Sequence, residues 1–218
     1  MTDPLVLAID TASEFGSIAL LVPGQAPVET VIHSGDGHAH KLFGALEAVL
    51  ARVGIAVTEI DCFAAAAGPG SFTGVRVAMS AVKGLAEANG KPMVAVSNLA
   101  AIAWHGAGPL RAAFVDARRG EIFGGVYDGQ SRIVAPEVAM KLPAWLASLP
   151  PGAEPIATDP DMFQTILDRP VSAAPRALAG AVAAIARDCY LRGEAVDPAA
   201  TDANYVRRSD AELKWKEA

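Results

Sequence analysis

Residues 68–89 read GPGSFTGVRVAMSAVKGLAEAN, a glycine-rich turn that leads into a long helical pattern. The turn follows the apolar run from Cys62 to Ala67, which has the length of a buried strand. Its glycines allow backbone conformations that residues with a Cβ avoid, and Ser71 or Thr73 can cap the first free amides of the helix. The stretch therefore predicts strand, turn and helix in succession. Free amides at a helix start attract anions.

The predicted helix has an unusual surface. Apolar residues recur at helical spacing from Val75 to Ala86, which predicts one face packed on a sheet, and polar residues recur from Arg76 to Glu87. The rest of the circumference is small and apolar, where a surface helix normally carries charge. Two interpretations fit this pattern: a central helix of one domain, or a helix shared with a partner subunit.

A second helix, predicted over residues 39–53, has the same feature. Leu42, Leu46, Val49 and Val53 form its inward stripe, and its back is small and uncharged. Two adjacent helices of this kind favour an interface. We therefore expect a partner interface made of Phe43, Gly44, Ala48, Ala51, Gly74, Val77, Ala78, Ala81 and Leu85.

The composition limits the classes of protein. A chain of 218 residues suits one large domain or two compact ones, and 52% of its residues are hydrophobic. It has no apolar run long enough to span a bilayer and no basic start typical of a signal peptide, so we expect a soluble cytoplasmic protein. Cys62 and Cys189 are expected to be two buried, reduced thiols. The net charge of −6 argues against binding nucleic acid through the overall field.

The beginning of the chain predicts a hairpin, with strands over residues 5–10 and 16–22. Its turn places hydroxyl groups beside a carboxylate. Asp10, Thr11 and Ser13 have the chemistry to hold a phosphate or a magnesium-bound water, and equally the chemistry of an Asx or Ser/Thr turn that closes the hairpin. A third strand is predicted over residues 29–33, and the nearby histidines do not have a spacing that favours a metal site.

The second half begins like the first. After a strand over 93–96 and a helix from Ser97 to about His105, residues 106–109 are the best linker candidate. Strands over 111–116 and 121–127 then form a second hairpin with Arg118 and Arg119 at its tip, a weak internal repeat. Residues 136–175 predict short helices around a strand near Ile156, and 178–192 predict a helix. We expect domains over 1–105 and 106–199, and an arm over 200–218 that packs back on its own domain or on a partner.

Four motifs together resemble the TsaB family, also called YeaZ. They are LAIDTASEFGSIAL at 7–20, AAAAGPGSFTGVRVAMSAVKGLAEANGKP at 64–92, VDARRGEIFGGVYD at 115–128 and ANYVRR at 203–208. The resemblance implies an α/β fold of the actin-like ATPase (ASKHA) class, with two related domains of mixed β-sheet flanked by helices. Within that fold Asp10, Thr11, Ser13, Asp116 and Arg118 are candidates to face a phosphate or nucleotide.

TsaB resembles TsaD, the catalytic subunit that adds threonylcarbamoyl to the adenosine beside the anticodon of certain tRNAs. TsaD binds its metal through an HxxxH pair, and the corresponding place here holds Asn98 and Ile102, which cannot replace two imidazoles. The resemblance therefore implies a non-catalytic subunit that pairs with TsaD and helps recruit TsaE. It implies no intrinsic cofactor, ATP and metal on the partner subunits, tRNA contact through the complex, and no membrane.

An alternative from another class is an independent ATP-dependent phosphotransferase, because the fold belongs to ATP users. Against it, the second half is short and shows no obvious glycine-rich segment for adenine. In isolation, the chain is expected to pair with itself through the same apolar helical faces.

Overall fold

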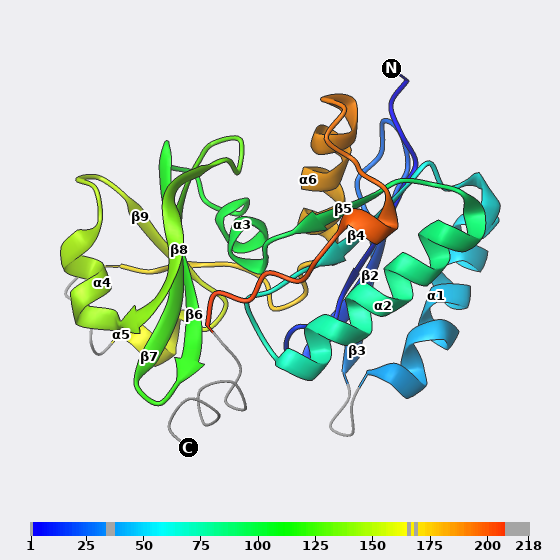
Figure 1. The fold of residues 1–218 in the computed structure, drawn as a ribbon. Helices are drawn as coiled ribbons and strands as arrows, with labels where there is room; N and C mark the ends of the chain where they lie inside the picture. Colours follow the sequence, from blue (N-terminus) through cyan, green and yellow to red (C-terminus); the bar gives the residue numbers. More distant parts are fainter. Residues whose placement is uncertain (1, 34–37, 165–166, 168–169, 208–218) are drawn as a thin grey trace. The chain divides into compact units, whose positions relative to one another are not determined.

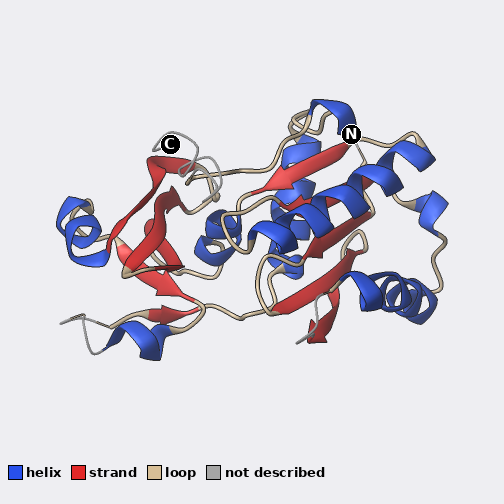
Figure 2. Cartoon of the chain, turned by 60° about the horizontal axis from the view of Figure 1, so that its bottom comes forward, coloured by secondary structure: helices blue, strands red, loops and turns tan. Residues whose placement is uncertain are grey.

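The structure, a computed structural model, describes residues 2–33, 38–164, 167 and 170–207. The chain forms two compact units (Figure 1). Unit 1 comprises the chain up to Asn98 together with Arg176–Ala203, and unit 2 comprises Leu99–Pro175 together with the described residues from Asn204 onward. In each unit, helices (blue in Figure 2) flank a sheet (red).

Unit 1 is built on a five-stranded mixed sheet of order β3-β2-β1-β4-β5. Strand β2 is antiparallel to both β1 and β3, whereas β4 is parallel to β1 and β5 is parallel to β4. The predicted first hairpin is thus confirmed. The strands are β1 (Val6–Asp10), β2 (Phe15–Leu21), β3 (Val28–His33), β4 (Cys62–Ala66) and β5 (Met93–Val96).

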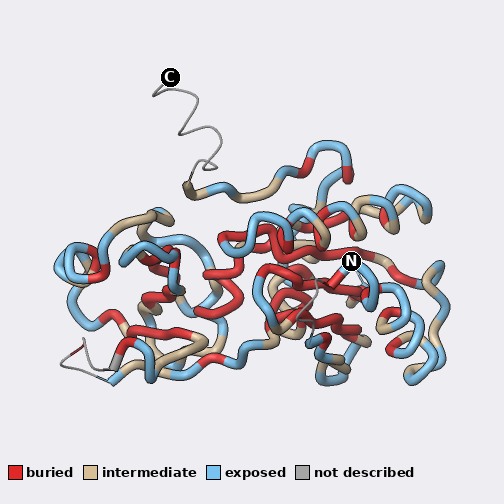
Figure 3. Tube along the Cα trace, turned by 90° about the horizontal axis from the view of Figure 1, so that it is seen from below, coloured by how far each residue is buried: buried red, intermediate tan, exposed pale blue. Residues whose placement is uncertain are grey.

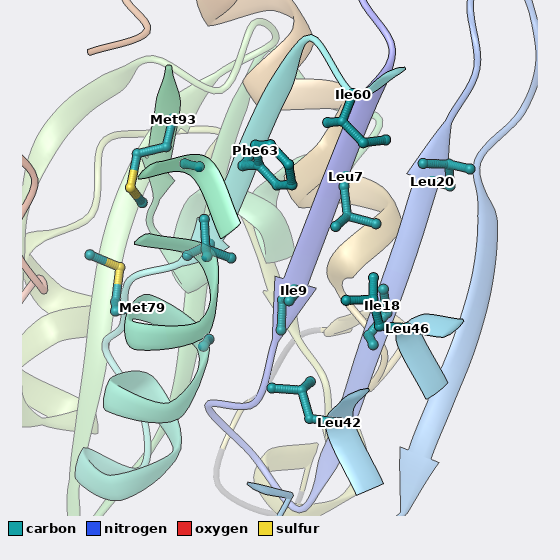
Figure 4. Packing of buried hydrophobic residues seen from close by; sticks show 14 of the residues in the cluster. Leu7, Ile9, Ile18, Leu20, Leu42, Leu46, Ile60, Phe63, Met79 and Met93 are labelled. Carbon is teal, nitrogen blue, oxygen red and sulfur yellow. The ribbon is translucent and has the colours of Figure 1, made fainter. Parts of the chain in front are cut away.

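Helices cover both faces of this sheet, with α1 and α2 on one face and α6 on the other (Figure 1). The α1/α2 face carries the larger side chains of the strands, such as Leu7, Ile18 and Phe63, which pack with Leu42 of α1 and Met79 of α2 (Figure 4). The helical segments of unit 1 are α1 (Ala39–Val53), η1 (Val57–Glu59), α2 (Phe72–Asn89), α6 (Ala179–Leu191) and η2 (Pro198–Ala200).

Helix α2 begins and ends where the sequence predicts. The Ser71 hydroxyl accepts a hydrogen bond from the Gly74 amide at 3.2 Å, and Gly90 ends the helix in the left-handed conformation, with φ of 60°. The stripe predicted to face the sheet is buried along its whole length, from Val75 to Ala86. Figure 3 shows the resulting pattern in unit 1, with buried strands and outward helix turns that are exposed.

Unit 2 repeats the strand pairing of unit 1. Its sheet has the order β10-β9-β6-β7-β8, in which β7 is antiparallel to β6 and β8, β9 is parallel to β6 and β10 is parallel to β9. The expected internal repeat is therefore confirmed, and it extends to the whole sheet. The elements are α3 (Asn98–Ala103, whose first residue belongs to unit 1), β6 (Leu110–Arg118), β7 (Glu121–Asp128), β8 (Ile133–Lys141), α4 (Leu142–Ser148), β9 (Glu154–Ala157), α5 (Pro160–Gln164) and β10 (Ser172–Ala173).

Strand β8 was not predicted. It lies at the edge of its sheet, contains Pro136, and pairs with β7 through register shifts. Proline is tolerated there because one side of an edge strand donates no ladder hydrogen bonds. The proline and the irregular register obscure the alternating pattern by which a strand is recognised.

The division of the chain differs from the expected domains 1–105, 106–199 and 200–218. Helix α6 packs on β1, β2 and β4 of unit 1, and the backbone of Val196 pairs with Met93 of β5. Residues 176–203 therefore belong with the first half of the chain. The described end of the arm packs on unit 2, since Arg207 forms an ion pair with Glu121 at 3.1 Å. Residues 208–218 lie outside the described part.

Both cysteines are free. Burial raises the pKa of the Cys62 thiol to about 12, and Cys189 is only partly buried, so the expected burial holds for the first thiol alone. In the part of the chain that the structure describes, no helix has the length and apolar character needed to cross a bilayer.

Candidate functional site

Asp10 ends β1 in a fully buried position. Its Oδ1 accepts hydrogen bonds from the Ala12 amide at 2.9 Å and from the Asn98 side-chain amide at 3.2 Å. Among the described residues, its Oδ2 has no hydrogen-bond partner. Burial raises the pKa of this carboxyl to about 6, because the ionised form loses its hydration.

Asn98 joins three segments of unit 1. Besides its bond to Asp10, its Oδ1 accepts from the Gly68 amide at 2.9 Å, and its own backbone amide donates to the Gly68 carbonyl at 2.9 Å. A side-chain amide suits this position because it donates on one side and accepts on the other. Asn98 and Ile102 are both buried. The two positions that the resemblance aligns with metal ligands thus have structural roles here.

Thr11 is held by the glycine-rich turn. Its hydroxyl donates to the Gly74 carbonyl at 2.7 Å, and a Cβ placed on Gly74 would lie 1.9 Å from the Thr11 carbonyl oxygen. The Ser71 amide also donates to the Ala12 carbonyl at 2.7 Å. The glycine-rich turn therefore packs directly against the β1–β2 turn, and only glycine fits at position 74.

The β1–β2 turn forms the Asx and Ser/Thr turn that was one of the two interpretations of its sequence. The Asp10 bond to the Ala12 amide closes an Asx turn, and the Ser13 hydroxyl accepts from the Phe15 amide at 3.1 Å. Asp10, Thr11 and Ser13 thus lie together. Their side-chain oxygens form hydrogen bonds within the fold, except the Asp10 Oδ2, which has none among the described residues. Their role towards a phosphate stays a prediction.

Asp116 and Arg118 lie at the β6–β7 turn of unit 2, where both are exposed. The Asp116 Oδ1 accepts from the Arg118 amide at 2.8 Å. These two candidates are therefore brought together in their own turn. They belong to unit 2, whereas Asp10, Thr11 and Ser13 belong to unit 1.

The predicted interface residues divide into three groups by exposure. On α1, Phe43 exposes 55% of its surface, and Gly44, Ala48 and Ala51 are exposed as well. On α2, Val77, Ala81 and Leu85 are half-buried. Gly74 and Ala78 are buried against the sheet of unit 1 and cannot contact a partner, so their assignment to the interface was wrong. Val77, on the outer face, is three residues from Gly74 and one residue from Ala78, and the small size of Gly74 and Ala78 concealed the difference.

Sequence reasoning missed the contacts that fix α6. The Ala179 amide donates to the Ser17 hydroxyl at 3.0 Å, and the Gly180 amide donates to Glu29 Oε1 at 3.2 Å. Strands β2 and β3 thus cap a helix more than 150 residues away in sequence, which no local signal indicates. The ring of His38 packs on Gly16, and its Nε2 lies 3.1 Å from the Gly16 amide nitrogen, a contact that the sequence did not indicate.

Comparisons with known proteins agree with this architecture. The family model described as TsaD, tRNA N6-adenosine threonylcarbamoyltransferase, matches residues 32–189. The TsaB biosynthesis protein of Bacillus subtilis is 31% identical over 69% of this chain and 68% of its own length. That of Escherichia coli is 36% identical over 56% of this chain, and the chain spans about half (54%) of that relative's length. The solved structure of YeaZ from Pseudomonas aeruginosa superimposes with a TM-score of 0.80 at 30% identity, covering 93% of this chain and 99% of that one.

Proposed function

The chain belongs to the TsaB (YeaZ) branch of the TsaD family, and we propose that it is the non-catalytic subunit of the complex that makes threonylcarbamoyladenosine in tRNA. In this proposal it pairs with TsaD through the outer faces of α1 and α2, and the pair recruits TsaE. The chain holds no cofactor of its own, and the partner subunits supply ATP and metal.

The main observation in support of this proposal is the outer surface of α1 and α2. We define the pairing face as Phe43, Gly44, Ala48 and Ala51 of α1 with Val77, Ala81 and Leu85 of α2. All seven are uncharged, and all are exposed or half-buried in the isolated chain. Both helices cover the same face of one sheet. A stable protein–protein contact of ordinary size removes roughly 1,600 Å² from water in total, and small uncharged residues let helices approach closely enough to form it.

The packing around Asn98 supports the non-catalytic part of the proposal. A metal-dependent transferase needs ligands such as imidazole at its metal, whereas Asn98 is committed to Asp10 and Gly68, and Ile102 is buried hydrocarbon. The β1–β2 turn is likewise engaged by the glycine-rich turn through Thr11. These contacts favour a scaffold over the alternative of an independent phosphotransferase.

Gly44→Arg tests the pairing face with little risk to the fold. Beyond its own helix, a Cβ at Gly44 meets no atom of the described residues within 4 Å, so the free chain can accommodate the arginine. In a complex with TsaD the same side chain would be an unpaired charge at an apolar contact. We expect Gly44→Arg, and likewise Ala81→Arg, to leave the thermal unfolding transition intact and to abolish co-elution with TsaD from the same organism.

Ala147→Arg is the matched control. It adds the same charge at an exposed position of α4 in unit 2, outside the pairing face, and should leave co-elution unchanged. Co-elution of both pairing-face variants with TsaD at wild-type levels would contradict this assignment.

A further inference from the structure

The turn between β6 and β7 has an unusual backbone. Arg118 and Arg119 have φ angles of 63° and 59°, and Gly120 follows with φ of 75°. Two successive arginines in the left-handed region cost conformational energy that glycine or asparagine would largely avoid. Such backbone outliers are concentrated where the side chains have a function.

The turn holds both arginines in exposed positions. The Arg118 amide donates to Asp116 Oδ1 at 2.8 Å, and Arg118 lies opposite Glu121 in the backbone register of β6 and β7. The backbone that carries the two guanidinium groups is therefore anchored. An anchored donor loses less conformational entropy on binding than one on a freely moving loop.

Further basic residues surround this turn. Lys141 of β8 lies opposite Glu121 in the sheet register, and Arg207 forms an ion pair with Glu121 at 3.1 Å. We define the basic surface as Arg118, Arg119, Lys141 and Arg207. These four cations outnumber the two carboxylates of the same turn, Asp116 and Glu121, on a chain whose net charge is −6. A positive region on an acidic protein indicates an anionic ligand.

We propose that the basic surface binds phosphate oxygens of an RNA backbone. This inference rests on the proposed function, which gives the chain an RNA partner, and it assigns the contact to a place on this subunit. The planar fork of a guanidinium matches a phosphate group and can donate two hydrogen bonds to it. The basic groups come from a turn, a neighbouring strand and the C-terminal segment, a spread that suits successive phosphates along a strand.

The experiment measures tRNA affinity as a function of salt concentration. A fluorescently labelled tRNA transcript is titrated with the full chain, alone and in complex with TsaD, for the wild type and for R118Q/R119Q. We expect the double variant to bind about tenfold more weakly or worse, and its slope of log affinity against log salt to be shallower by about 1.5, since each lost phosphate contact removes about 0.7 to 0.9. The control R132Q/R192Q removes two exposed arginines that lie outside both the basic surface and the pairing face, and it should keep the wild-type affinity and slope.

A second variant separates binding from folding. R118N/R119N removes the charges and places asparagine, which tolerates the left-handed region, at both strained positions. We expect it to unfold at a higher temperature than the wild type while binding tRNA more weakly. If the arginines only supported the fold, the melting temperature would fall instead.

Two results would overturn the inference. One is wild-type affinity and salt slope for R118Q/R119Q both alone and in the complex. The other is binding of inorganic tripolyphosphate or ATP that R118Q/R119Q abolishes while tRNA binding is unchanged, which would assign the surface to a free nucleotide. Intact pairing with TsaD in either case would show that the proposed function survives and that only the RNA contact is wrong.

Discussion

Asp10 has a buried carboxyl, one oxygen of which has no hydrogen-bond partner among the described residues, and the burial affects stability. Its pKa is raised by burial from an ordinary 3.8 to about 6 in the folded chain. Between these two values the folded state binds more protons than the unfolded state, so the free energy of unfolding falls as pH rises through that window. Above the folded pKa, the full cost of burying the ionised Asp10 carboxylate applies. It lowers the free energy of unfolding by on the order of 3 kcal/mol, at about 1.4 kcal/mol per pKa unit.

Asp10→Asn should therefore stabilise the protein at pH 8. The amide keeps an oxygen to accept from Asn98 and Ala12 and has no charge to bury. We expect a gain of about 1–3 kcal/mol in denaturant unfolding at pH 8 that shrinks progressively towards pH 4. A gain that is the same at both pH values, or larger at pH 4, would mean that Asp10 is not a buried titrating group.

Gly74 and Gly44 form a matched pair of helical glycines. A Cβ at Gly74 would meet the Thr11 carbonyl at 1.9 Å, whereas one at Gly44 would meet no described residue outside its own helix within 4 Å. Gly74→Ala should cost about 2–3 kcal/mol because the backbone of β1 and α2 must separate. Gly44→Ala should instead stabilise by about 0.5–1 kcal/mol through helix propensity. Unfolding curves that show the same sign for both variants would contradict this account of the glycine-rich turn.

At the scale of elements, α6 depends on strands that are remote in sequence. Ser17 is buried on β2, and its hydroxyl accepts from the Ala179 amide at the start of the helix. Ser17→Ala should leave this buried amide without an acceptor and cost about 1–2 kcal/mol. Ser13→Ala, at an exposed turn serine, is the control and should change stability by less than about 0.5 kcal/mol. Equal effects would show that the Ser17 contact does not hold α6.

The elements that the sequence predicted well are those with local signals. Helix α2 has a capping serine, a terminal glycine and an apolar stripe, and the β1–β2 and β6–β7 hairpins have apolar runs around short polar turns. Strand β8 lacked a clear alternation. The place of α6 in unit 1 depends on contacts with β1, β2 and β4, which are tertiary contacts invisible to a local pattern.

The partner interface stays a prediction, and the structure bears only on which of its residues are accessible. The small residues of α1 and α2 marked a face suited to close contact, but a small residue gives no sign of which side of the helix it occupies. Gly74 and Ala78 were therefore assigned outward although they face the sheet. The role of Asn98 was also missed, because its partners Asp10 and Gly68 are 88 and 30 residues away.

For the whole molecule, the repeated sheet and the pairing face are both consistent with the proposed role as a non-catalytic subunit. Both units have the strand pairing of an actin-like ATPase fold, while Asn98 and Ile102, which stand where the resemblance places metal ligands, are buried. We propose that this chain retains the architecture of a catalyst and contributes a surface for one. The amount of threonylcarbamoyladenosine in the tRNA of the cell should then depend on the pairing face.

The most direct measurement is mass spectrometry of tRNA nucleosides from a strain that lacks the gene and carries it back as wild type, Gly44→Arg or Ala147→Arg. The account predicts that threonylcarbamoyladenosine is lost on deletion, is restored by the wild type and by Ala147→Arg, and is not restored by Gly44→Arg at equal protein level. Unchanged threonylcarbamoyladenosine in the deletion strain, or full restoration by Gly44→Arg, would contradict it.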